Sequence, residues 1–351
     1  MKIAYILPSL DAKAPIFLAK RLSDFFLQLR NEVSVFYFDD IVKTHFDCPA
    51  RQIKMNEPID FDSFDIVHSH MFRPDKYVAK YAKQIHHAKT VSTVHCNIYD
   101  DLKYSYGDFI SFIFSKVWLH YLKRINVTVQ INDYLMKLYE KSLRRSTLIY
   151  NGIEISEEQD DYSEIARQVS AFHTKKLSVL CSYSGLVKRK GLIQVLELLR
   201  SRKDLAYICI GKGEQKEALI DYAEKNGISD RVFFSPFKKN PYHVMKYADV
   251  FVIPSYSEGF SLALLEAGTV GAAVVCSDIP AFSMPFCNNE VSFFSLDNID
   301  SFSRAVDDAQ CNKEQKIKSL QAHIKKDFSE EKMFSEYEKL YQKLFSGKTN
   351  L

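Results

Sequence analysis

Short apolar runs alternate with longer helical patterns along the chain. The apolar runs are rich in β-branched and aromatic residues and predict strands, while the segments between them place apolar residues at helical spacing. The strands predicted in the first part are 2–7, 32–38, 64–70, 89–95, 126–132 and 146–152. After an acidic, polar segment at 156–164 the alternation starts again. The strands predicted there are 177–185, 205–211, 231–237, 248–255 and 272–278.

This alternation predicts an α/β fold with two parallel sheets, because strands that alternate with helices form right-handed βαβ units. We place one doubly wound, Rossmann-like domain at 1–164 and a second at 165–328. The segment 329–351 contains a helix with an apolar stripe, which predicts that it packs on another element. Doubly wound domains bind ligands at the carboxyl ends of their strands. Two of them facing across a cleft favour an enzyme over a structural protein.

The composition narrows the cellular location. Of the 351 residues, 46% are hydrophobic, which supports a sizeable core. No apolar run approaches the roughly 18–20 residues that span a bilayer, and the first residues predict a strand rather than a signal peptide. The seven cysteines include no CxxC pair, which argues against a disulfide framework or a zinc site. We expect a cytoplasmic protein, or one on the inner face of the cell membrane.

The segment 248–282 carries the most chemical information. It combines a buried strand at 248–255, a loop, and a helix at 261–268. Gly259 allows a ligand to approach the backbone closely. The free N–H groups of residues 259–262 form an anion site, because the start of a helix favours negative charge.

Two carboxylates flank this anion site. Glu266 lies in the helix among apolar residues, so we expect it to be buried, with ribose hydroxyls as its donors. Glu258 lies on the loop, where it can accept hydrogen bonds from sugar hydroxyls. A phosphate with a carboxylate on either side describes a site for a nucleotide sugar. The alternative is that Glu266 pairs with a buried Lys or Arg and that Glu258 is a solvated loop residue.

These features resemble the glycosyltransferases of the GT-B fold, family 4, also called glycosyl transferases group 1. The E-x7-E motif of that family matches Glu258 to Glu266. Further segments that resemble family elements are 150–154, 184–191, 211–219 and 243–255. The resemblance implies an acceptor-binding N-terminal domain and a donor-binding C-terminal domain. It also implies that the helix in 329–351 crosses back to the N-terminal domain, and that transfer retains the anomeric configuration.

The resemblance implies roles for individual residues as well. Glu266 would bind the donor ribose, Glu258 the transferred sugar, and Lys190 the diphosphate leaving group, where negative charge develops. The other donor-binding positions are Gly185, Gly211, Gly259, Phe260 and Ser261. The family usually has an arginine where this chain has Gly185. We expect Arg189 to replace that charge in catalysis, with Lys188 as the alternative.

Three histidines lie at strand ends of the first domain. His95 matches the histidine that the family places beside the transferred sugar, and we count it among the catalytic residues. For His68 and His70 we favour a structural role.

The sequence shows no pattern for metal or cofactor binding. Asp60 and Asp62 form an Asp-x-Asp pair, but it precedes a predicted strand instead of following one. No His or Cys cluster has the spacing of metal ligands. We expect no cofactor, no metal and no nucleic-acid partner.

The region 68–145 has an excess of positive charge, with 13 basic and 6 acidic residues. Within it, the segment 104–126 is strongly aromatic. The basic residues in and before that segment include Arg73, Lys76, Lys80, Lys83, Lys116, Lys123 and Arg124. One interpretation is a surface that binds an anionic membrane. The other is that Phe112, Trp118 and their neighbours form the core face of a helix.

Taken together, we expect a retaining hexosyltransferase that uses a nucleotide sugar, in our expectation a UDP-sugar. Its acceptor would be a glycan or a lipid-linked glycan of lipopolysaccharide, capsule or another surface polysaccharide. Two alternatives stay open. A GT-B sugar-nucleotide epimerase would share the fold, and a non-catalytic subunit that binds nucleotide sugar is favoured by Gly185 in place of arginine.

Overall fold

The computed structural model describes residues 1–143, 145–158 and 160–347. Contacts within the chain divide it into two compact units. The first contains Met1–Asn151 and the terminal segment from Glu331, and the second contains Gly152–Glu330. Of the segment 329–351 that we expected to hold the last helix, residues 348–351 lie outside the described residues.

The change between the units falls after Asn151, whereas the sequence suggested residue 164. Hydrogen bonds explain the difference. The backbone N–H of Ser156 donates to the Tyr242 hydroxyl at 3.2 Å, and Asn240 Nδ2 donates to the Glu158 carbonyl at 2.8 Å. A polar connection of this kind has no apolar periodicity that would assign it to one sheet or the other.

In the first unit, seven strands of the described chain form one parallel sheet in the order β3-β2-β1-β4-β5-β6-β7. The strands are β1 (Lys2–Leu7), β2 (Glu32–Tyr37), β3 (Ala50–Gln52), β4 (Ile66–His70), β5 (Lys89–Val94), β6 (Val127–Gln130) and β7 (Ser146–Leu148). The sequence did not predict β3, because this exposed three-residue edge strand has no apolar pattern.

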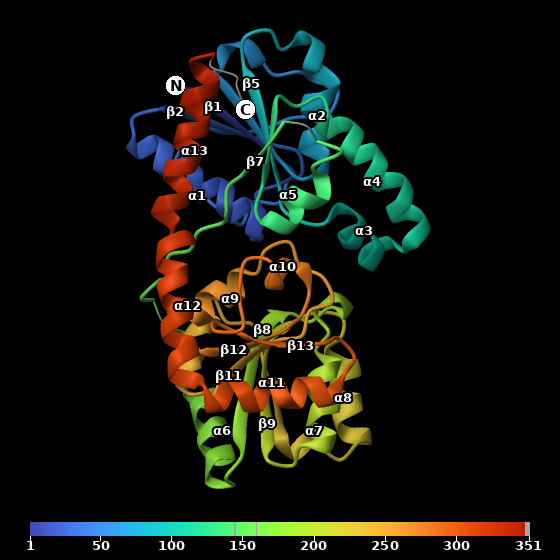
Figure 1. Cartoon of the computed structure of the whole chain (residues 1–351). Coiled ribbons are helices and arrows are strands. Elements are labelled where there is room, and N and C mark those ends of the chain that lie inside the picture. Colours follow the sequence, from blue (N-terminus) through green and yellow to red (C-terminus); the bar gives the residue numbers. More distant parts are fainter. Residues whose placement is uncertain (144, 159, 348–351) are drawn as a thin grey trace. The chain divides into compact units, whose positions relative to one another are not determined.

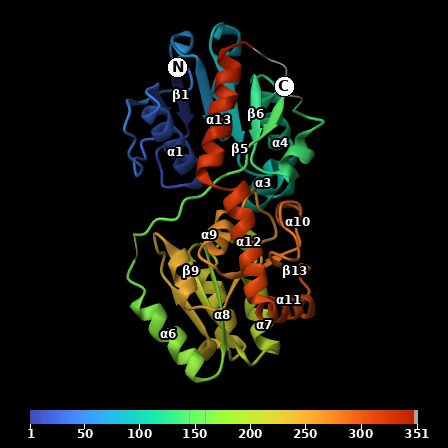
Figure 2. The same ribbon diagram turned by 60° about the vertical axis from the view of Figure 1, so that its left-hand side comes forward.

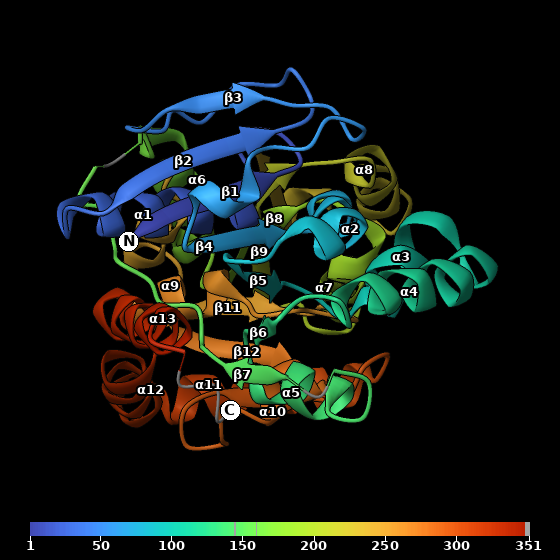
Figure 3. The same ribbon diagram turned by 90° about the horizontal axis from the view of Figure 1, so that it is seen from above.

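Helices cover both faces of this sheet (Figure 1). They are α1 (Ala14–Gln28), α2 (Phe72–Tyr81), α3 (Ile98–Tyr106), α4 (Asp108–Leu122), α5 (Asp133–Tyr139) and α13 (Glu330–Phe345). Seen from above, α1 and α13 lie on one face and α2 and α4 on the other (Figure 3). The apolar stripe of α13 belongs to the core of this unit: Met333, Tyr337, Leu340, Tyr341 and Leu344. Tyr341 stacks on Phe26 with 4.7 Å between the ring centroids.

The second unit contains a six-stranded parallel sheet in the order β10-β9-β8-β11-β12-β13 within the described residues. Its strands are β8 (Ser178–Gly185), β9 (Leu205–Lys212), β10 (Val232–Ser235), β11 (Val250–Ile253), β12 (Ala273–Ser277) and β13 (Ser292–Phe294). Its helices, visible in Figure 2, are α6 (Ser163–Thr174), α7 (Ile193–Ser201), α8 (Lys216–Lys225), α9 (Leu262–Thr269), α10 (Pro280–Ser283), α11 (Ile299–Cys311) and α12 (Lys313–Asp327).

Both units are doubly wound α/β domains, as the alternation of strands and helices predicted. Each sheet reverses its strand order at an inner pair, β1 and β4 in the first unit and β8 and β11 in the second. Such reversal points are where open parallel sheets bind ligands. Among the described residues, no helix has both the length and the apolar composition needed to cross a membrane.

Candidate functional site

Glu258 lies in the loop that connects β11 to α9, and its side chain is almost fully buried, with 6% of the residue exposed. Its Oε1 accepts hydrogen bonds from Lys190 Nζ at 2.5 Å and from the Ser255 hydroxyl at 2.7 Å. Arg189 Nη1 lies 3.5 Å from Oε2 and donates to the Ser257 carbonyl at 2.7 Å. Glu258 is therefore neither the solvated residue of the alternative interpretation nor an unpaired carboxylate at a rim.

These neighbours keep Glu258 charged. Burial favours the neutral form and acts to raise the pKa of a carboxyl group. The charges of Lys190 and Arg189, with the hydrogen bonds from Lys190 and Ser255, outweigh burial and lower the pKa of Glu258 below its usual value. The carboxylate is ionised at neutral pH, and the two cations leave the cluster with one excess positive charge.

Both cations lie on a short 3₁₀ segment, Lys188–Lys190, that follows β8. The segment ends at Gly191, whose φ of +63° lies in the left-handed region. A Cβ at this position would come within 2.0 Å of the Pro254 carbonyl oxygen. Gly191 therefore allows the cationic segment to lie against the end of β11. Of the two candidates for the missing arginine, Arg189 is bonded within the site and Lys188 is exposed.

The predicted donor-binding glycines lie at the carboxyl ends of two paired strands. In the register of β8 and β9, Gly211 pairs with Ser184, and Gly185 pairs with Lys212. Gly211 has a φ of +150°, and a Cβ there would lie 2.0 Å from the Ser184 carbonyl oxygen. No atom lies within 4 Å of a Cβ built on Gly185, so the space beside this residue is open.

Helix α9 begins directly after the Glu258 loop, and a helix cap and a ring contact fix the position of its first residues. The Ser261 hydroxyl caps the helix by accepting a hydrogen bond from the Leu264 N–H at 3.3 Å. Phe260 is 9% exposed, and its ring packs against Phe328 with 5.5 Å between centroids. Gly259 is buried as well. Three predicted donor-binding residues thus form one ordered helix start.

Glu266 is half-buried, so our expectation of a fully buried carboxylate was wrong. It lies on a side of α9 that is only partly covered, where Ala263 and Val270 are also half-buried. Its neighbour Tyr183 is buried and donates to the Ala263 carbonyl at 3.1 Å. Burial and the charge of Glu266 raise the pKa of Tyr183 well above its usual range.

A cavity of about 20 Å³ joins these elements within the second unit. Its lining includes Ser184, Lys190, Ser255, Ser261 and Ala263. The site therefore brings together the ends of β8 and β11 and the start of α9. Sequence reasoning missed Ser255 and Tyr183, because their only signal was a position near the end of a predicted strand.

Three histidines of the first unit, His68, His70 and His95, form a cluster. His70 Nδ1 and His95 Nε2 are 2.9 Å apart, and the rings of His68 and His70 lie 4.2 Å apart between centroids. His68 Nδ1 is 2.6 Å from the Tyr341 hydroxyl, and its Nε2 is 2.8 Å from the Thr93 hydroxyl. His68 and His70 are fully buried, whereas His95, directly after β5, is partly exposed.

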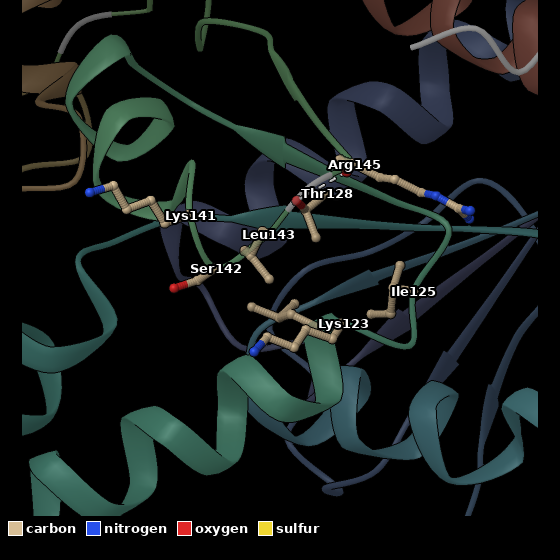
Figure 4. Close-up of a pocket in the computed structure, with 8 residues that line it drawn as sticks. Lys123, Ile125, Thr128, Lys141, Ser142, Leu143 and Arg145 are labelled. Atoms are coloured by element: carbon tan, nitrogen blue, oxygen red, sulfur yellow. Dashed lines mark hydrogen bonds between the residues drawn. The ribbon is translucent and has the colours of Figure 1, made fainter.

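A larger pocket of about 550 Å³ lies in the first unit near the amino ends of β6 and β7. Its basic residues are Lys123, Lys141 and Arg145. Their side chains extend in different directions from the wall, so they do not converge on one ligand (Figure 4). None of the predicted site residues lines this pocket.

The Asp-x-Asp pair has a structural explanation. Asp62 Oδ1 accepts hydrogen bonds from the backbone N–H groups of His86 and His87 at 2.9 and 2.8 Å. Hydrogen bonding by these amides lowers the pKa of Asp62. Within the described residues there is no group of three or more His, Cys, Asp or Glu side chains placed to hold a metal ion.

Two doubly wound α/β units in one chain are the architecture of the GT-B class of fold. The second unit holds Glu258, paired with Lys190 and Arg189, beside the start of α9. Comparison with known proteins agrees. The family model "Glycosyltransferase Family 4" matches residues 28–157, and "Glycosyl transferases group 1" matches residues 163–326. The chain belongs to the group 1 glycosyl transferases of the GT-B fold.

Individual proteins are similar to this chain over nearly its whole length, WclY in sequence and the two solved structures in fold. The O-antigen biosynthesis glycosyltransferase WclY of Escherichia coli is 29% identical, with 98% of this chain and 99% of WclY covered. Anabaena HepE, solved in complex with UDP, has a TM-score of 0.79 at 16% identity, covering 97% of this chain and 100% of HepE. Sucrose-phosphate synthase from Thermosynechococcus elongatus has a TM-score of 0.78 at 13% identity, covering 99% of each chain.

Proposed function

We propose that this glycosyltransferase moves a hexosyl group from a UDP-sugar to a glycan or lipid-linked acceptor in lipopolysaccharide-type or other surface-polysaccharide synthesis, with retention of configuration. The name of the E. coli relative, an O-antigen biosynthesis glycosyltransferase, supports a role in surface-polysaccharide synthesis. Structures of HepE with UDP and with UDP-glucose support the donor class.

One observation carries the proposal: the cluster of Lys190, Arg189 and Glu258 beside the start of α9. The cations and the helix start would bind the diphosphate, and their positive charge would stabilise the leaving group as the glycosidic bond breaks. Lys190 and Arg189 can then turn from Glu258 toward phosphate oxygens. Glu258 in turn accepts a hydrogen bond from a hydroxyl of the sugar, which replaces a bond from Lys190.

In the proposed retaining step, the bond from the anomeric carbon to the phosphate oxygen breaks, and a bond to the acceptor oxygen forms on the same face. The proton of the acceptor hydroxyl passes to the departing phosphate oxygen. This step needs no carboxylate as nucleophile. Glu266 is proposed to bind the ribose and His95 to contact the transferred sugar. We also propose that the positive charge of Lys190 and Arg189 serves in place of a metal ion.

We further propose that the protein works at an anionic membrane surface through the hairpin of α3 and α4. The side of α4 that packs against the rest of its unit carries the buried residues Ser111, Ser115, Trp118 and Leu122. The opposite side carries large apolar residues, with Phe109 78% and Phe112 55% exposed. Exposed apolar clusters of this kind indicate a binding surface. The pocket cations Lys123, Lys141 and Arg145, at the end of α4 and beyond it, add positive charge.

For the segment 104–126, the interpretation as the core face of a helix fits one of the two named residues and not the other. Trp118 is buried, and its Nε1 donates to Asp75 Oδ2 at 2.7 Å, so the core interpretation holds for this residue. Phe112 faces outward with Lys116 Nζ 3.7 Å from its ring centroid, and the core interpretation is wrong for it.

The test is release of nucleoside diphosphate from a panel of nucleotide sugars, with and without lipid-linked acceptor extracts. Release from one UDP-sugar, lost in Glu266→Ala, supports the proposal, and EDTA should leave the rate unchanged. Donor binding without release under any condition would favour the non-catalytic subunit. A product that is an epimerised nucleotide sugar would favour the epimerase.

A further inference from the structure

The hydrogen bond between the buried His70 and the partly exposed His95 has a defined direction. His70 Nδ1 and His95 Nε2 form one hydrogen bond of 2.9 Å, in which one ring must donate and the other must accept. Burial lowers the pKa of His95 to about 3, and burial followed by the neighbouring histidines lowers the pKa of His70 well below its usual range. Both rings are therefore neutral at neutral pH, and each carries a single N–H.

The second nitrogen of His70 decides which ring donates. His70 Nε2 is buried and has no hydrogen-bond partner among the described residues. A buried N–H without an acceptor is rarer in folded proteins than a buried lone pair without a donor. The favoured arrangement therefore leaves Nε2 of His70 unprotonated. His70 then carries its proton on Nδ1 and donates it to His95.

The direction of this hydrogen bond sets the tautomer of His95. Because His95 Nε2 accepts the hydrogen bond, the single proton of the ring lies on Nδ1. Nδ1 has no hydrogen-bond partner in the described part of the chain, and the residue is partly exposed. His95 thus presents an N–H donor to whatever oxygen lies beside it.

We infer that His70 is a positioning residue that fixes His95 as the Nδ1–H tautomer, so that His95 donates a hydrogen bond to an oxygen of the sugar substrate. The contact of His95 with the sugar rests on the proposed function, whereas the tautomer of His95 does not. His68 supports the arrangement from behind, since its ring packs on His70 and is itself held by the hydroxyls of Thr93 and Tyr341.

The tautomer can be measured directly in the full-length protein. Long-range ¹H–¹⁵N correlation spectra of ¹⁵N-histidine-labelled protein distinguish protonated from unprotonated ring nitrogens. The signals of His95 are assigned by their absence in His95→Asn. We expect a protonated Nδ1 and an unprotonated Nε2. A ring protonated at Nε2, or at both nitrogens near neutral pH, would overturn the inference.

Two variants of nearly equal size test the same point in the reaction. The amide N–H of an asparagine can stand where His70 Nδ1–H stands, whereas leucine has no donor. His70→Asn should keep the tautomer of His95 and kcat/KM close to wild type. His70→Leu should release the tautomer and lower kcat/KM about fivefold, the rate equivalent of one hydrogen bond.

Thermal unfolding of both variants separates positioning from a loss of fold. Equal losses of activity in the two variants, at similar stability, would contradict the positioning role. The contact of His95 with the sugar is tested separately: His95→Asn with full activity would sink that contact, while the spectra would still report whether His70 sets the tautomer.

Discussion

Lys190 Nζ donates to Glu258 Oε1 at 2.5 Å, and both residues lie beside the start of α9. This ion pair joins two residues to which sequence reasoning gave separate roles, one for the diphosphate and one for the sugar. In the structure, each of the two neutralises the charge of the other. In the function we propose, a donor molecule replaces this pairing with a phosphate for the lysine and a hydroxyl for the glutamate.

Lys190→Ala should lower the rate of transfer by about 10²-fold, because the charged donor that we propose for the leaving group is lost. It should also lower stability, since Glu258 loses its shortest charged partner while buried. The rate is measured as release of nucleoside diphosphate, and the stability by thermal unfolding. Lys225→Ala, an exposed lysine of α8, is the matched control. Unchanged release in Lys190→Ala would exclude Lys190 from the reaction.

Arg189→Ala should lower activity strongly, and Lys188→Ala only slightly. Arg189 is bonded to the Ser257 carbonyl and faces Glu258, whereas its neighbour Lys188 is exposed. The measurement is kcat/KM for the same donor in both variants, which each lack one positive charge. A larger loss in Lys188→Ala would assign the missing family arginine to Lys188 instead.

Gly211→Ala should destabilise the second unit, while Gly185→Ala should leave its stability unchanged. A Cβ on Gly211 meets the Ser184 carbonyl oxygen and requires a φ of +150°, but the space beside Gly185 is open. The strained backbone costs about 1–3 kcal/mol. Thermal unfolding of the two variants compares them directly. Equal unfolding midpoints would show that the chain relaxes around the added methyl group.

Asp75 should make the protein less stable as the pH rises from about 4 to 6. Burial raises the pKa of Asp75 to about 6, although Ser69, Trp118 and Ser92 donate hydrogen bonds to it. The folded state therefore holds its proton longer than the unfolded state. Stability from this group is present below the unfolded pKa near 3.8 and is lost as the pH rises through 6.

The size of this effect is about 3 kcal/mol. Asp75→Asn keeps the shape of the side chain and cannot ionise, so its stability should lack this decline. Chemical unfolding of both proteins at several pH values measures the difference. Parallel curves for wild type and variant between pH 4 and 7 would show that Asp75 does not titrate in this range.

Phe109→Ser with Phe112→Ser should reduce binding to vesicles that contain phosphatidylglycerol. Each of these exposed rings gains roughly 1.5–3 kcal/mol when it is buried in an apolar environment. Co-sedimentation with vesicles reports the bound fraction, and uncharged phosphatidylcholine vesicles separate the electrostatic part. Phe17→Ser, an exposed phenylalanine of α1, is the matched control. Equal binding of the double variant and the control would exclude this hairpin as the membrane contact.

Local pattern was enough to predict the fold class, most of the strands and the core stripe of α13. Buried parallel strands and amphipathic helices carry their periodicity in the chain itself, because each must bury one apolar face. The E-x7-E motif also located the Glu258 loop and the start of α9. The edge strand β3 escaped prediction because its three residues are exposed and bury nothing.

The pairing of side chains was decided by tertiary structure. Lys190 and Glu258 are 68 residues apart, and they meet because β8 and β11 are neighbours in the sheet. The outward face of Phe112 and the inward face of Trp118 likewise depend on where α4 packs against α2. The sequence of α4 is apolar on nearly all sides, so its pattern does not indicate which side is buried. The tertiary contact of Trp118 with Asp75 decides which side that is.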